Sequence, residues 1–214
     1  MSELWPLRHL RVRTPLLELR WPSEADLYEL GALAADGVHP PDFMPFTVPW
    51  TDAEPAVRGR NTLQWFWRQA GAIAPESWIL NLVTVAGGAV VGTQGLDAQQ
   101  FVTLREAETG SWLGLRHQGR GIGTEMRAAI VHLAFEGFGA EYVVSSAFTD
   151  NHASLGVSRK IGYAEDGIMR KMRKDKADTL IRLRLSREAW QARRRTDIEI
   201  SGLEPCLPLF GLAD

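Results

Sequence analysis

The segment that most limits how this chain can fold is a mid-sequence turn with three glycines, Gln118-Gly119-Arg120-Gly121-Ile122-Gly123. A β-rich run over 109–115 precedes it, and an amphipathic helix is predicted over 123–138 after it. Glycines adopt positive φ and let the backbone approach a ligand closely. The start of the following helix adds unpaired N–H donors and the positive end of the helix dipole. The pattern therefore predicts a phosphate or diphosphate site.

The spacing of the glycines separates this turn from the common nucleotide-binding loops. Glycines at 119, 121 and 123 form Gly-x-Gly-x-Gly, whereas a dinucleotide fingerprint reads Gly-x-Gly-x-x-Gly. A P-loop needs Gly-Lys-Ser/Thr at its end, and Gly123-Thr124 lacks the lysine. The structural alternative is a tight turn without a ligand, which the basic neighbours Arg116, His117 and Arg120 disfavour.

The order of predicted elements indicates one mixed α/β domain, and 214 residues suit a single core. Ser23 is expected to cap the first helix, with Asp26 reaching back to the cap. Gly87-Gly88 between two β-rich runs predicts a hairpin. All of the predicted elements, in chain order, are strand 16–21, the Ser23-capped helix, helix 54–72, strands 78–86, 89–95 and 109–115, helix 123–138, strand 142–148, helix 152–161, and a hairpin of 168–173 with 179–185.

Composition narrows the setting in which the protein works. The formal net charge is −2, which gives no reason to expect bulk nucleic-acid or membrane binding. No apolar stretch approaches the length of a membrane span, and the N-terminus lacks the pattern of a signal peptide. A single cysteine, Cys206, precludes an internal disulfide, and no His or Cys spacing suggests a metal. We expect a cytoplasmic protein without a metal.

Two motifs resemble those of the GNAT N-acyltransferases. The glycine turn is similar to their Gln/Arg-x-x-Gly-x-Gly/Ala signature, whose backbone amides hold the CoA pyrophosphate. Asn151-His152-Ala153-Ser154 with Lys160-Ile161-Gly162-Tyr163 resembles the subgroup that acylates ribosomal-protein N-termini, the RimJ/RimL type. The resemblance covers roughly 14–190 and implies a sheet with splayed central strands. It divides the chain into an acyltransferase domain, 1–190, and a C-terminal extension, 191–214, packing on the same domain.

A narrower likeness concerns the acyl donor. Gly37-Val38-His39, Val48-Pro49-Trp50-Thr51 and Pro208-Leu209-Phe210-Gly211 are similar to an actinobacterial subgroup that includes a succinyl-CoA-dependent transferase. The implied co-substrate is therefore an acyl-CoA, either acetyl-CoA or succinyl-CoA.

The resemblance also implies which residues bind the donor. A backbone amide at Leu113, Gly114 or Leu115 stabilises the tetrahedral oxyanion, and the sequence leaves open which of the three is free. Asn151 is predicted to be a helix N-cap that also contacts the pantetheine. The donor-binding set is Leu113, Leu115, Arg116, Gln118, Gly119, Arg120, Gly121, Ile122, Gly123, Thr124, Asn151 and Lys160.

Three side chains are candidates for proton transfer. Ser154 matches the serine of Asn-x-x-Ser and would serve the leaving thiolate, or else it satisfies local backbone in the first helical turn. Glu108 is the first choice as general base, and its alternative is a solvated charge beside Glu106. His39 is the second choice, and its alternative is a hydrogen-bonding loop residue. An acceptor amine of low pKa would need no dedicated base.

The loop 36–52 joins the first two helices, a region that shapes the acceptor site in the family. Its apolar residues, with one from the predicted cleft strand, would wall an acceptor pocket: Phe43, Met44, Phe46, Trp50 and Trp112. The alternative is that they cover the core or a dimer interface. The expected acceptor is a small-molecule amine or a protein N-terminus, and the expected assembly is a homodimer or higher homo-oligomer.

Two other functions remain open from sequence. The first is an aminoacyl transferase of the same fold that takes its acyl group from aminoacyl-tRNA, held by the basic late hairpin and by 193–195. The second is a CoA-binding sensor without catalysis. The net charge disfavours the first, and an Asn-x-x-Ser motif beside the glycine turn favours an enzyme over the second.

Overall fold

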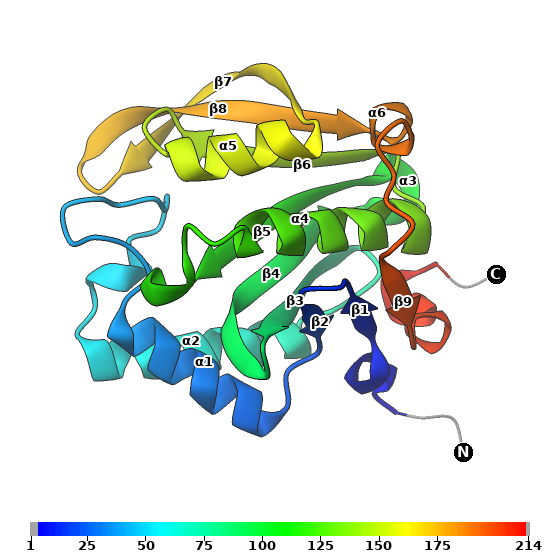
Figure 1. The fold of residues 1–214 in the computed structure, drawn as a ribbon, viewed down its shortest axis with the longest axis horizontal. Coiled ribbons are helices and arrows are strands. Elements are labelled where there is room, and N and C mark those ends of the chain that lie inside the picture. Colours follow the sequence, from blue (N-terminus) through cyan, green and yellow to red (C-terminus); the bar gives the residue numbers. More distant parts are fainter. Residues whose placement is uncertain (1–3, 213–214) are drawn as a thin grey trace.

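A computed structural model describes residues 4–212. Its strands form one open sheet of nine, with helices packed against it (Figure 1). The strand order is β7-β8-β6-β5-β4-β3-β2-β1-β9, and every neighbouring pair is antiparallel except β5 with β6. The strands are β1 (Arg11–Arg13), β2 (Glu18–Arg20), β3 (Ser77–Ala86), β4 (Ala89–Gln99), β5 (Glu106–Leu113), β6 (Tyr142–Phe148), β7 (Ala164–Arg173), β8 (Lys176–Ser186) and β9 (Glu199–Ser201).

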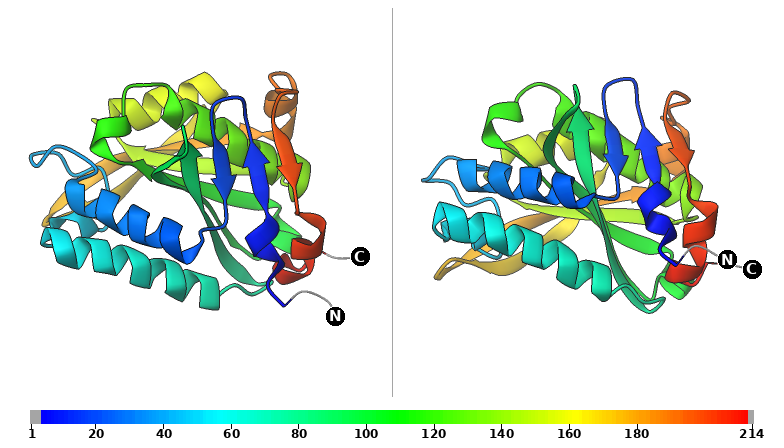
Figure 2. Two further views of the ribbon diagram at one scale, coloured as in Figure 1. Left: turned by 60° about the horizontal axis from the view of Figure 1, so that its bottom comes forward. Right: turned by 90° about the horizontal axis from the view of Figure 1, so that it is seen from below.

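Helices lie on both sides of this sheet. They are α1 (Glu24–Asp36), α2 (Pro55–Gly71), α3 (Phe101–Leu104), α4 (Ile122–His132), α5 (His152–Ile161) and α6 (Arg187–Gln191). A π-helical turn, Leu133–Gly137, continues α4. Short 3₁₀ helices span Pro6–His9, Trp50–Asp52, Leu115–His117 and Glu204–Phe210. In Figure 2, α1 and α2 lie side by side, and β1, β2 and β9 form one edge of the sheet.

Alternating side chains divide the core between the two faces of the sheet. On β3, Leu80 and Leu82 belong to the large cluster that contains Met126 and Ile130 of α4. Val83 belongs instead to the smaller cluster beneath α1 and α2. Successive strand residues point to opposite faces, so α4 covers one face and the α1–α2 pair covers the other. The predicted mixed α/β architecture is confirmed.

Two short neighbouring strands at one side of the sheet were not predicted from sequence. β1 and β9 contain three residues each and pair with one another, Val12 opposite Ile200. Three residues carry too little periodicity to be recognised, and only their neighbours in the sheet define them. Beyond β9, Cys206 and Phe210 are fully buried in the large cluster, so the C-terminal segment contributes to the same core.

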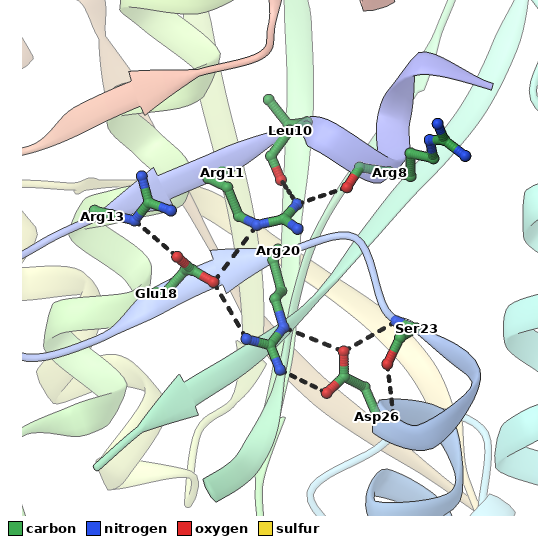
Figure 3. A network of polar contacts seen from close by, with 8 residues as sticks. All are labelled: Arg8, Leu10, Arg11, Arg13, Glu18, Arg20, Ser23 and Asp26. Carbon is green, nitrogen blue, oxygen red and sulfur yellow. Dashed lines mark hydrogen bonds and ion pairs between the residues drawn. The ribbon is translucent and has the colours of Figure 1, made fainter. Parts of the chain in front are cut away.

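A network of charges fixes the start of α1 to the first strands (Figure 3). Ser23 accepts a hydrogen bond from the Asp26 amide at 3.1 Å, and the Asp26 carboxylate accepts from the Ser23 amide at 2.9 Å, which is the predicted capping box. Arg20 binds both Asp26 oxygens, at 2.7 and 3.1 Å. Arg20 also contacts Glu18, which in turn pairs with Arg13.

Replacing Asp26 by alanine is expected to lower the free energy of unfolding by about 3 kcal/mol, because it removes the carboxylate half of the capping box and leaves Arg20 with only Glu18 as partner. Asp26 is only 5% exposed. Burial alone would raise its pKa, but hydrogen bonds from Arg20 and Ser23 bring the pKa below the ordinary value. The stabilisation is therefore present at neutral pH and is lost as the pH falls below about 4.

Urea unfolding of wild type and Asp26→Ala at pH 7 and pH 3 measures this difference. The difference in free energy of unfolding between wild type and Asp26→Ala should be smaller at pH 3 than at pH 7. Glu136→Ala, which breaks an exposed ion pair with Arg194, serves as control and should change stability by less than about 0.5 kcal/mol. A gap that is equal at both pH values would contradict the role given to the Asp26 carboxylate.

Candidate active site

Among the strands of residues 4–212, β5 and β6 alone run parallel, and this pair separates within a few residues. β5 and β6 are paired from Glu106 opposite Tyr142 to Glu108 opposite Val144. β5 then continues to Leu113 against β4, and β6 continues to Phe148 against β8. Beyond Glu108 and Val144, no strand of the described residues pairs with the facing edges of β5 and β6, which leaves an opening in the middle of the sheet.

One backbone group on β5 is directed into this opening. The Gly114 amide donates to the Val91 carbonyl and the Leu115 amide to the Gly37 carbonyl, each at 3.0 Å. Antiparallel ladders alternate, so the peptide groups of Leu113 point away from β4. The Leu113 carbonyl accepts 2.9 Å from Gln118 Nε2, which agrees with that direction. Of the three amides left open by the sequence, Leu113 is therefore the one that faces β6.

The glycine turn lies between the end of β5 and the start of α4, as predicted. Gly119 and Gly121 have φ of +73° and +82°, and a Cβ atom added to either would meet no protein atom within 4 Å. Gly121 caps α4 without a side-chain hydrogen bond, while the Thr124 amide donates to the Gly121 carbonyl at 3.0 Å. No capping side chain competes for the first amides of α4, so the turn fits an anion such as a diphosphate.

Positive charge gathers around this turn. Arg116 and Arg120 are exposed, and Arg116 pairs with Asp36 at 2.8 Å. Partial burial and these two arginines lower the pKa of His117, which indicates an electropositive surface. Lys160 is not part of this group: it is exposed near the far end of α5, about 13 Å along that helix from Asn151.

The side-chain amide of Gln118 forms hydrogen bonds within the protein and thereby fixes the position of the turn. Its Nε2 donates to the Val38 carbonyl at 2.7 Å and to the Leu113 carbonyl at 2.9 Å. The same side chain thus joins the turn, the end of β5 and the start of the Pro-rich loop. A shallow hollow beside it is lined by Leu33, Asp36, Gly37, Leu115 and Arg116.

The second motif lies at the same end of the molecule. The Asn151 side chain accepts from the Ser154 amide at 3.1 Å, so the predicted N-cap is confirmed. α5 starts a few residues after β6 ends, and Figure 1 shows α4 and α5 beginning at the same end of the sheet. Ser154, half-buried in the first turn of α5, is thereby placed on the β6 side of the opening.

Glu108 lies on the opposite face from α4, at the point where β5 and β6 separate. It shares that face with Trp112, which packs against the α1–α2 cluster. Ser146 of β6 donates to Glu108 Oε1 at 3.3 Å, and Asp97 of β4 is directly opposite Glu108 in the ladder. Part of the Glu108 side chain is open to solvent, yet desolvation by the surrounding protein raises its pKa, and Asp97 raises it further.

The Pro-rich loop places a row of rings next to this face. His39, Phe46, Trp50 and Trp112 form consecutive contacts with ring centroids 5.9, 5.2 and 5.7 Å apart. Both nitrogens of His39 are engaged within the loop, Nδ1 with the Pro40 carbonyl at 2.8 Å and Nε2 with Thr51 Oγ1 at 2.7 Å. This geometry matches a loop-stabilising histidine.

The other two loop residues point elsewhere. Met44 is buried, and its sulfur accepts from Thr51 Oγ1 at 3.7 Å. Phe43 lies under the Arg173 guanidinium, 5.3 Å from ring centroid to Cζ. Arg173 of β7 also donates to the Met44 carbonyl at 2.7 Å, so the late hairpin anchors the loop.

Several site residues were missed by sequence reasoning. Asp97, Ser146 and Arg173 join the site only through strand register and the hairpin. Arg127 is buried on α4 beneath the opening, and its one sequence signal was a charge next to the apolar stripe of that helix.

Among residues 4–212, no group of three or more His, Cys, Asp or Glu side chains is arranged to hold a metal ion. None of the helices described combines the length and apolar character that a membrane span requires.

Comparison with known proteins gives one family. A model described as an acetyltransferase (GNAT) domain matches residues 17–164. The structure is similar to Mycobacterium smegmatis RimJ in complex with CoA-disulfide, with 19% identity, a TM-score of 0.70, and coverage of 100% of this chain and 99% of that one.

Two further solved structures have the same fold. Ribosomal-protein-S5-alanine acetyltransferase from Vibrio fischeri is 14% identical with a TM-score of 0.64, covering 84% of this chain and 98% of its own. The microcin C7 self-immunity acetyltransferase MccE, in complex with acetyl-CoA and AMP, is 15% identical with a TM-score of 0.63, covering 80% and 93%.

Proposed function

This chain belongs to the GNAT acetyltransferase family, and from that premise we propose that it transfers an acyl group from acyl-CoA to a primary amine by direct attack in a ternary complex. Family membership identifies an acyl-CoA-dependent N-acyltransferase. The acyl group, which the sequence likeness narrows to acetyl or succinyl, and the order of events are part of the proposal. So are the roles given below to individual residues.

One observation carries the proposal: the Leu113 amide points toward the opening between β5 and β6, and the first turn of α4 lies beside it. A Cβ atom on Gly123 would meet Leu113 Cδ1 at 3.8 Å and Val157 Cγ2 of α5 at 3.6 Å. Amides of Gly119, Gly121, Ile122 and Gly123 would hold the diphosphate of the donor, with Arg116 and Arg120 adding charge. The pantetheine would extend along the free edge of β5. Its thioester carbonyl would then accept a hydrogen bond from Leu113, which stabilises the oxyanion that develops during attack.

Proton transfer completes the reaction. Glu108, on the opposite face, accepts a proton from the amine, directly or through a water, as the amine nitrogen bonds to the thioester carbon. The C–S bond then breaks, and the thiolate takes a proton. Ser154, at the start of α5, would donate a hydrogen bond to that sulfur. Asn151 supports Ser154 by fixing the first turn of the helix.

The acceptor would approach from the face of Glu108. Phe46, Trp50 and Trp112 provide an apolar wall there, and the carboxylates of Glu108 and Asp97 favour a basic amine over an acidic one. A small-molecule amine and a protein N-terminus both fit these features.

Transfer from aminoacyl-tRNA receives less support from the basic clusters. Arg173 pairs with Asp150 and Asp178, Arg194 pairs with Glu136, and Arg195 pairs with both Glu125 and Asp197. These cations are largely neutralised within the protein, which reduces the local charge available to a phosphate backbone.

The proposal is tested by measuring thiol release from acetyl-CoA and succinyl-CoA with a thiol-reactive dye, across a panel of amines that includes peptides, amino acids and polyamines. Release that depends on amine, together with the mass of an N-acylated product, is the expected result. CoA binding without any acylated product would favour the sensor function. Salt-sensitive tRNA binding without CoA binding would favour the aminoacyl transferase.

A further inference from the structure

Arg127 occupies an unusual position for a charged side chain. It lies on α4, six residues after Gly121, and is only 4% exposed. Its Nη1 donates to Ser145 Oγ of β6 at 3.2 Å, and its Nη2 donates to Ser111 Oγ of β5 at 3.3 Å. Glu108 and Val144 are the last residues of β5 and β6 that pair, and Ser111 and Ser145 lie just beyond them on their own strands. The guanidinium therefore spans the closed end of the opening.

Arg127 has no directly paired carboxylate. Within residues 4–212 its guanidinium forms no ion pair, its buried Nε has no hydrogen-bond partner, and Glu108 acts on it only through a longer-range Coulomb attraction from the other face of the sheet. The groups that hydrogen-bond with its guanidinium are neutral hydroxyls, those of Ser111, Ser145 and the buried Tyr163, whose oxygen lies 3.3 Å from Thr109 Oγ1. A buried cation without a directly paired anion is costly, and a ligand that brought negative charge to this guanidinium would offset that cost.

The position of Arg127 indicates which part of a ligand reaches it. Arg127 lies on the α4 face of the sheet, the same side as the glycine turn, whereas Glu108 and the acceptor loop are on the other face. Ser111 precedes Leu113 by two residues, about 7 Å along the strand toward the closed end. If the thioester carbonyl of the donor is bound at the Leu113 amide, its acyl chain therefore extends toward Arg127.

We propose that Arg127 binds a carboxylate at the far end of the acyl group, so that the preferred donors are CoA thioesters of short dicarboxylic acids. This inference rests on the proposed function, because it requires the thioester to lie at Leu113. Two or three methylene groups between thioester and carboxylate suit the spacing. Arg127 would then determine donor specificity without taking part in proton transfer.

Calorimetric titration of the intact protein with CoA, acetyl-CoA, butyryl-CoA, succinyl-CoA and glutaryl-CoA tests this directly. Butyryl-CoA has the four carbons of succinyl-CoA without its charge. The better of the two diacid thioesters is expected to bind about tenfold to a hundredfold more tightly than butyryl-CoA. Arg127→Met should remove that preference while leaving the affinity for CoA itself unchanged. Arg194→Met, an exposed arginine far from the opening, should retain the preference.

Two results would overturn this inference without affecting the proposed function. One is that the wild type binds butyryl-CoA and both diacid thioesters with equal affinity. The other is that Arg127→Met loses affinity for all of the donors equally. The second result would give Arg127 only a structural role between β5 and β6. Absence of CoA binding by the intact protein would overturn the proposed function as well. Should Arg127→Met fail to fold, Arg127→Lys retains the charge but not the planar fork, and a reduced preference is expected.

Discussion

The Gly121→Trp variant is expected to lose CoA binding by more than about a hundredfold, with its fold intact. Gly121 adopts a left-handed conformation at the start of α4, and a Cβ atom there points into space that no protein atom occupies. An indole in that space would exclude a diphosphate from the first amides of the helix. The strain of a positive φ costs about 1 kcal/mol, which the protein should tolerate. Calorimetric titration with CoA measures the loss.

A matched control separates strain from loss of the site. Gly87, in the turn between β3 and β4, has φ of +58° and equally open space at its Cβ position. Gly87→Trp introduces the same residue at a similar backbone conformation and should bind CoA like the wild type. Full CoA binding by Gly121→Trp would show that the diphosphate does not lie at this turn.

Replacement of Glu108 by glutamine is expected to lower kcat by about 10² to 10⁴ and leave CoA affinity unchanged. The variant keeps the shape of the side chain but cannot accept the proton of the attacking amine. Glu106→Gln, on the same face of β5 but paired with Arg184, is the control and should retain most of the activity. An undiminished kcat in Glu108→Gln would mean that the amine reacts without a dedicated base.

The same assignment makes a prediction about pH. Desolvation and the facing Asp97 raise the pKa of Glu108, and a base must be unprotonated to act. Activity should therefore fall as the pH decreases through a value above that of an ordinary carboxyl group. Asp97→Asn removes a neighbouring negative charge, lowers the pKa of Glu108 and should shift this acidic limb to lower pH. A profile of kcat/KM against pH for both proteins measures the shift.

Much of the fold was predictable because its signals are local. The capping box of Ser23 and Asp26, the diglycine hairpin and the N-cap Asn151 each involve residues within four positions of one another. The short strands β1 and β9 were missed for the opposite reason, since each is three residues long and they pair with one another across the length of the chain. The sequence left open whether His39 acts as a base or stabilises its loop, and in the structure both ring nitrogens have partners within that loop.

By itself, the sequence determined that a glycine turn lies between a strand and a helix in a mixed α/β domain, since glycine spacing and hydrophobic periodicity are properties of contiguous residues. Only the tertiary structure decided that Leu113 is the amide facing the opening, that Asp97 lies opposite Glu108, and that Arg127 is buried with its Nε unpartnered among residues 4–212. Each of these depends on strand register, which places side by side residues that are distant in sequence.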